Sequence, residues 1–238
     1  MIMLDKIVPC VVAALNSTPN EIAALISTVK TGIDITYSVR NYFLLEKLET
    51  YFIEFKYDTI SDDDRQKFFD MLTELGKTPE KLSILVIIIL DRLDRGYKAK
   101  YLAKLVKALQ GSKISYTQFE DMSKILENWF ESDTDTLKTY MNIYNANIKQ
   151  EVYEKPYTIE FARRERLVAQ GIIIPHISNK STQSDFYNYE PSIYAHIMME
   201  LINVQAFSTD FSTRRTGGEI SYRGLIKSTY VMNGDEGL

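Results

Sequence analysis

Histidine and cysteine, the side chains that most often serve as metal ligands or as catalytic bases and nucleophiles, are scarce in this chain of 238 residues. The histidines are His176 and His196, and the single cysteine is Cys10. So few residues exclude a Cys/His metal cluster, and the sequence indicates no partner for a catalytic histidine. We expect Cys10 to pack as a small apolar side chain among the neighbouring valines, because free cysteine is among the most buried residue types.

Two further runs have the composition of ion sites. The run Ser-Asp-Asp-Asp at positions 61–64 could offer carboxylates to a cation, but a serine followed by acidic residues is typical of the first turn of a helix. The run at positions 111–115 resembles the exit of an EF-hand loop. In that register the ligand positions fall on Lys107, Leu109 and Gly111, which carry no carboxylate. The sequence therefore predicts a capped helix at each place and no metal site.

Motifs for nucleotide binding and acyl transfer are also not indicated. Gly217-Gly218 lacks the lysine and the strand-to-helix setting of a phosphate-binding loop, and no serine lies in a nucleophile-elbow motif. We therefore predict a protein that is not an enzyme, with no catalytic residues, no bound cofactor and no metal.

Basic side chains gather in two stretches. Lys100, Lys104 and Lys107 recur at helical spacing with Lys98 nearby, and we expect them to form the solvated outer face of a helix. The second stretch, Arg-Arg-Glu-Arg at positions 163–166, precedes a short apolar run. The net charge of −4 argues against a dedicated nucleic-acid binder, because phosphate contacts favour basic proteins.

The composition is that of a globular protein that can bury a core, with 45% hydrophobic and 25% charged residues. The apolar run at positions 82–90 is too short to cross a bilayer. A single cysteine excludes an intramolecular disulfide, so we expect a reducing, cytoplasmic location.

Capping residues and apolar side chains at three-to-four spacing predict helices over most of the chain. The stretch at positions 82–93 is apolar on nearly every side, so we expect it to be the central helix of a bundle, covered on several sides. The predicted helices cover approximately residues 19–32, 34–57, 61–75, 79–93, 97–110, 115–130, 133–147, 157–170 and 191–202.

The pattern changes in the C-terminal third. The β-branched run at 172–174, ended by Pro175, predicts a short strand. A polar turn is expected over 178–184, and the aromatic residues of 186–189 predict a returning strand. We expect Pro191 to start the helix that follows.

The segment from about 158 to 204 resembles the later half of a winged-helix module. The resemblance rests on an arginine-bearing helix, the sequence Leu-Val-Ala-Gln-Gly-Ile-Ile at 167–173, a polar turn, Tyr-Asn-Tyr at 187–189 and a further helix from Pro191. In DNA-binding members of that family, the helix before the wing lies in the major groove. Other winged helices are protein-interaction modules.

By position, the resemblance implies that Arg163, Arg164 and Arg166 face the DNA groove and that Lys180 lies in the wing. Acidic residues outnumber basic ones from position 157 onward, which favours the protein-interaction role over the DNA-binding one.

We therefore expect a mainly α fold, a multi-helix bundle followed by a small α+β, winged-helix-like element with a two-stranded hairpin. The predicted domains are an N-terminal apolar segment (1–18), the helical bundle (19–148), the winged-helix-like element (157–207) and a mobile C-terminal tail (208–238).

The predicted role is that of a non-enzymatic regulatory or adaptor protein that acts through protein–protein contacts, in a larger assembly or as a homo-oligomer. A DNA-binding winged-helix regulator is the alternative. Peripheral membrane association through the apolar N-terminal segment is a third interpretation. We place it last because the segment has few charges and its polar and apolar residues are poorly separated into two faces. The sequence does not indicate which protein is the partner.

Overall fold

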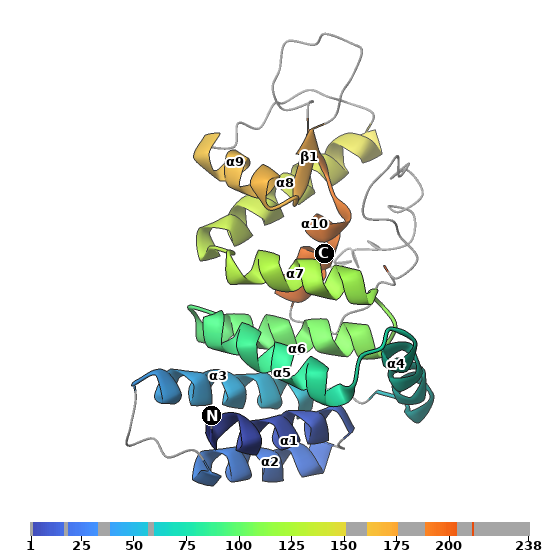
Figure 1. Cartoon of the computed structure of the whole chain (residues 1–238). Coiled ribbons are helices and arrows are strands. Elements are labelled where there is room, and N and C mark those ends of the chain that lie inside the picture. The colour runs from blue at the N-terminus through green and yellow to red at the C-terminus, as the bar shows by residue number, and fades with distance from the viewer. Residues whose placement is uncertain are drawn as a thin grey trace, which may run out of the picture. The chain divides into compact units, whose positions relative to one another are not determined.

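The computed structural model describes residues 2–16, 19–32, 39–56, 60–150, 161–175, 189–203 and Phe211. Within these residues the chain forms ten α-helices and one two-stranded antiparallel sheet (Figure 1). The mainly α fold with a two-stranded hairpin is as predicted, and the helix of residues 2–16 is additional to the nine that the sequence predicted. The elements in chain order are α1 (Ile2–Asn16), α2 (Pro19–Gly32), α3 (Val39–Lys56), α4 (Asp62–Glu74), α5 (Pro79–Arg92), α6 (Gly96–Gln110), α7 (Tyr116–Glu127), α8 (Glu131–Gln150), α9 (Phe161–Ala169), β1 (Ile173–Pro175), β2 (Tyr189–Pro191) and α10 (Ile193–Ile202).

The chain divides into two compact units, residues 1–130 with 200–212 (unit 1) and residues 131–199 with 213–238 (unit 2). These units differ from the predicted domains. α1 belongs to unit 1 rather than to a separate N-terminal segment, because it packs against α2 and α5. α8 belongs to unit 2 and contacts α9, whereas the sequence placed its residues in the bundle.

Side-chain caps start three of the helices where the sequence predicted them. Ser61 Oγ accepts the N–H of Asp64 at 3.1 Å, so the acidic run lies in the first turn of α4. Thr78 caps α5 and is followed by a first-turn proline. Ser115 and Gln118 form a complete capping box at the start of α7.

Three helix ends share the same left-handed cap. Gly76 and Gly171 have φ of 64° and 70°, and each stops a helix as predicted. The third position is Ser112, with φ of 54°, which follows α6. Ser112 donates its N–H to Leu109 O and Lys113 donates its N–H to Ala108 O, which is the hydrogen-bond pattern of a Schellman motif. A serine therefore occupies a position that usually requires glycine.

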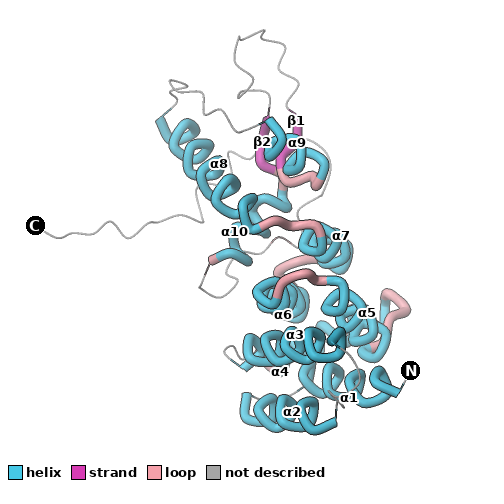
Figure 2. Tube along the Cα trace, turned by 90° about the vertical axis from the view of Figure 1, so that its left-hand side faces the viewer, coloured by secondary structure: helices cyan, strands magenta, loops and turns pink. Residues whose placement is uncertain are grey.

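Unit 1 is a stack of helices in which successive layers pack on each other. α2 packs on α1 and α3, α3 packs on α6, and α6 packs on α7, with α5 against α1 and α3 (Figures 1 and 2). The core is aromatic and aliphatic; its largest fully buried side chains include Trp129, Tyr51, Phe52, Phe68 and Phe119. The apolar residues of α1, among them Ile7, Val11 and Leu15, are buried in this core.

Unit 2 contains the hairpin, in which β1 and β2 are antiparallel with Ile173 opposite Pro191 (Figure 2). Pro191 is thus the last residue of β2, and the prediction that it starts a helix was wrong. Ser192 provides the N-terminal cap instead, because its Oγ accepts the N–H of Tyr194 at 3.1 Å. The predicted turn over 178–184 lies outside the described residues.

The stretch 82–93 was expected to be covered on several sides, and α5 packs against α1, α3, α6 and α7. Two of its apolar residues, Ile84 and Ile88, are nevertheless 40% and 39% exposed. One further prediction needs correction. Phe211, which lies within the range predicted to be a mobile tail, is buried within unit 1 with 2% exposure. Its main-chain hydrogen bonds to α7 and to the α6–α7 turn explain the difference.

Candidate functional site

The lysines of α6 do not form the solvated face that the sequence predicted. Lys98, Lys104 and Lys107 are buried, and only Lys100 of that set is substantially exposed. α6 packs against α3, α5 and α7, so the aliphatic stems of these lysines lie along apolar neighbours. Each of their ammonium groups contacts a main-chain carbonyl group, and that of Lys98 also pairs with the Asp94 carboxylate at 2.7 Å.

Each buried lysine of α6 binds the C-terminal end of a different helix. Lys98 Nζ lies 3.3 Å from Glu127 O, the last residue of α7. Lys107 Nζ lies 2.6 Å from Glu54 O in the last turn of α3. Lys104 Nζ lies 3.4 Å from Leu201 O in α10. The last carbonyls of a helix lack partners within the helix and carry the negative end of its dipole, so a cation is favourable there.

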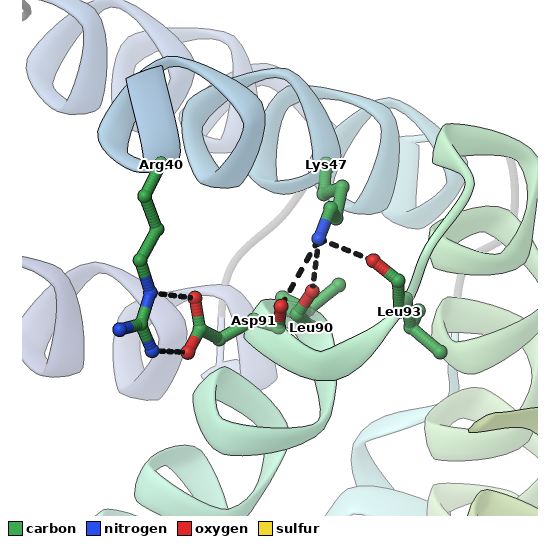
Figure 3. A network of polar contacts seen from close by, with 5 residues as sticks. All are labelled: Arg40, Lys47, Leu90, Asp91 and Leu93. Atoms are coloured by element: carbon green, nitrogen blue, oxygen red, sulfur yellow. Dashed lines mark hydrogen bonds and ion pairs between the residues drawn. The ribbon is translucent and has the colours of Figure 1, made fainter. Parts of the chain in front are cut away.

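Lys47 on α3 makes the same kind of contact with α5 (Figure 3). Its Nζ donates to the carbonyl oxygens of Leu90, Asp91 and Leu93, at 2.9, 3.2 and 2.5 Å. Burial lowers the pKa of Lys47, and the carboxylate of Asp91 partly offsets that effect. The same carboxylate binds Arg40, whose guanidinium lowers the pKa of Asp91. Lysine side chains that could have served as bases or phosphate ligands thus hold helices together.

The arginines singled out by the winged-helix resemblance lie on α9 in unit 2. Arg166 binds Asp133 of α8 with its Nη2 2.5 Å from Oδ1, and Asp133 is completely buried. The Arg164 guanidinium lies over the ring of Tyr189, 5.4 Å from its centroid. Arg163 is half-buried. Arg164 and Arg166 therefore contact residues of their own unit, and Lys180 lies outside the described residues.

The cysteine and the histidines, which the sequence offered as possible catalytic or metal-binding residues, are at least half-buried or lie outside the described residues. Cys10 is buried, its S–H donates to Lys6 O at 3.4 Å, and burial raises the pKa of its thiol, which suppresses the reactive thiolate. His196 is half-buried on α10, and His176 lies outside the described residues. In the described part of the chain, no group of three potential metal-binding side chains comes together, and no helix is both long and apolar enough to cross a membrane.

Exposed apolar side chains mark a different kind of candidate site on α5. Ile84 and Ile88 are one turn apart and face solvent between two exposed cations, Lys81 and Arg92. Arg92 also lies 3.7 Å from Glu127 of α7. We call these four side chains of α5 the α5 face. The sequence indicated that α5 is apolar on nearly every side, which is more than one buried stripe requires. It could not identify which side is exposed.

No protein-family model, curated protein or solved structure matches this chain. A functional proposal therefore depends on the geometry of its own residues.

Proposed function

We propose that this chain is a non-enzymatic adaptor or regulatory protein that binds a protein partner through the α5 face. The observation that carries the proposal is the exposure of Ile84 and Ile88, 40% and 39%, on a helix whose other large apolar residues are mostly buried. Exposed isoleucines gain free energy when a partner covers them, at about 25 cal/mol per Å² of apolar surface.

The charges around the isoleucines favour one class of partner. Lys81 and Arg92 are exposed and lie at the two ends of the α5 face. A helix with an apolar stripe flanked by carboxylates would match both the isoleucines and the cations, because complementary charges favour association and fix its register. The buried lysines support this role indirectly, since they rigidify the helices that present the surface.

The winged-helix interpretation of unit 2 stays a proposal. In support, α9, β1, β2 and α10 follow one another in the expected order, Leu167 is buried, and Gly171 ends α9. The contact of Arg166 with Asp133 gives that arginine a structural role, so no observation favours DNA binding. Membrane binding through α1 would require Ile7, Val11 and Leu15 to leave the core.

Photo-crosslinking tests the proposal. Benzoylphenylalanine at position 84 should crosslink to a distinct protein in native lysate, whereas the same group at position 53 should not. Ile53 is the matched control, because it is also 40% exposed but lies on α3. The same products from both positions, or none from position 84, would contradict a partner at the α5 face.

A further inference from the structure

Phe211 is held in unit 1 through both of its main-chain polar groups. Its N–H donates to Lys113 O at 2.5 Å, and its carbonyl oxygen accepts from Gln118 Nε2 at 2.9 Å. The residue is 2% exposed. The corner between α6 and α7 thus holds one phenylalanine of unit 1 through its peptide groups.

The donor of this corner is held in place by the capping box of α7. Gln118 is completely buried, and its Oε1 accepts the N–H of Ser115 at 2.8 Å in the capping box. The side-chain amide is thereby fixed with its oxygen toward Ser115, so its Nε2 is directed at the carbonyl of Phe211. A donor fixed in this way selects a main-chain carbonyl.

The acceptor of the corner comes from the left-handed cap after α6. Ser112 has φ of 54°, and Lys113 follows it with its N–H bonded back to Ala108. This turn leaves the carbonyl of Lys113 to accept from Phe211. Lys104 adds a contact to the same C-terminal part of unit 1, through the carbonyl groups of Leu201 and Asn203.

Both hydrogen bonds are made to main-chain groups, which nearly every residue type carries. The buried phenylalanine side chain therefore determines which peptide the corner binds. The chain itself contains a second copy of the tripeptide, since Phe-Ser-Thr occurs at 207–209 and again at 211–213.

We propose that the α6–α7 corner is a binding site for a peptide segment anchored by phenylalanine, filled here by Phe211 of the same chain, and that a partner segment binds it when Phe211 leaves. This inference does not depend on the α5 face. The two proposals use different side chains and are tested by different variants.

The test measures binding of a fluorescent synthetic peptide of residues 208–215 to the full chain. An occupant on the same chain competes with an effective concentration on the order of millimolar, so wild type should bind the peptide weakly. The variant Phe207→Ala/Phe211→Ala should bind it at least about tenfold more tightly, because both competitors on the chain are gone. A peptide with Phe211→Ala should not bind.

Gln118→Glu in that variant is the matched control. Ionised glutamate keeps the capping box and the start of α7 but cannot donate to a carbonyl, so at a pH that ionises it peptide affinity should fall about tenfold or more. Equal peptide affinity of wild type and the double alanine variant, both folded, would overturn the proposal. If the double alanine variant does not fold, Phe211→Leu replaces it, and peptide affinity no higher than that of wild type would overturn the proposal equally.

Discussion

The Nζ atom of Lys47 lies 2.5 Å from the carbonyl oxygen of Leu93, the residue directly after α5. This contact joins the middle of α3 to the C-terminal end of α5 through a buried charge. Such a charge is tolerated because the carbonyls around it replace water as hydrogen-bond acceptors.

Lys47→Met should lower the free energy of unfolding by about 2 kcal/mol. Methionine keeps the apolar stem but leaves three carbonyl groups without their donor. Chemical denaturation measures the change. Lys100→Met on α6 is the control and should stay within about 0.5 kcal/mol of wild type, because the Lys100 side chain is 41% exposed. Equal changes in the free energy of unfolding for the two substitutions would show that the contacts of Lys47 with the carbonyl groups contribute nothing to stability.

Stability should fall as the pH rises above about 10. Burial raises the pKa of Tyr51 and of Tyr140 above the ordinary value of 10.0, so the folded chain keeps protons that the unfolded chain loses. This stability is fully present below pH 10 and decreases above it. The lowered pKa of Lys47 acts in the opposite direction, but only below its ordinary value of 10.5.

Thermal unfolding between pH 8 and pH 11 checks this dependence. In Tyr51→Phe the decline should be shallower, because one of the two buried hydroxyls is removed. An unchanged slope would mean that Tyr51 is accessible to base in the folded state.

Ser112→Gly should raise the free energy of unfolding by about 1 kcal/mol, because glycine adopts a positive φ without the steric cost that a Cβ imposes. Gly76→Ala should have the opposite sign and a similar size. A Cβ at Gly76 meets no atom within 4 Å, so the cost there would come from the backbone alone. Urea denaturation measures the free energy of unfolding of both variants. A lower value for Ser112→Gly than for wild type would contradict the assignment of strain to Ser112.

Wild type should show little affinity for random duplex DNA at physiological salt, because the acidic chain opposes approach to a polyanion. Fluorescence anisotropy with a labelled duplex measures this. If the alternative is right, Arg163→Ala, Arg164→Ala and Arg166→Ala together should reduce affinity by orders of magnitude and flatten its salt dependence. Micromolar wild-type binding that these changes erase would establish DNA binding.

Arg166 complicates that triple variant, because removing it leaves Asp133 buried without its cation. The double variant Arg163→Ala/Arg164→Ala keeps the ion pair and is the cleaner comparison. Melting temperatures of both variants separate lost stability from lost binding.

Local signals predicted much of the fold. Ser61, Thr78 and Ser115 start helices, and Gly76 and Gly171 end them, because caps act on residues only a few positions away. The sequence also predicted the order of the helices and the hairpin in unit 2. It missed the cap at Ser112, because serine seldom takes a left-handed conformation.

The candidate site depended on contacts that no local pattern reveals. Lys104 and Leu201 are almost a hundred positions apart, so the sequence could not show that an amphipathic-looking lysine stripe is buried. Periodicity likewise identified α5 as apolar, but only tertiary packing decides that Val86 is covered while Ile88 is exposed. The Phe211 contact is hidden for the same reason.

The most direct test of the proposed function compares the native-lysate proteins that bind immobilised wild type, Ile84→Asp/Ile88→Asp and Ile53→Asp, with folding checked by circular dichroism. We predict that all three chains fold, since the replaced side chains are partly exposed. A specific protein should bind wild type and Ile53→Asp and be lost from the α5 double variant. If that protein binds the folded double variant as well as it binds wild type, the α5 face is not the binding surface.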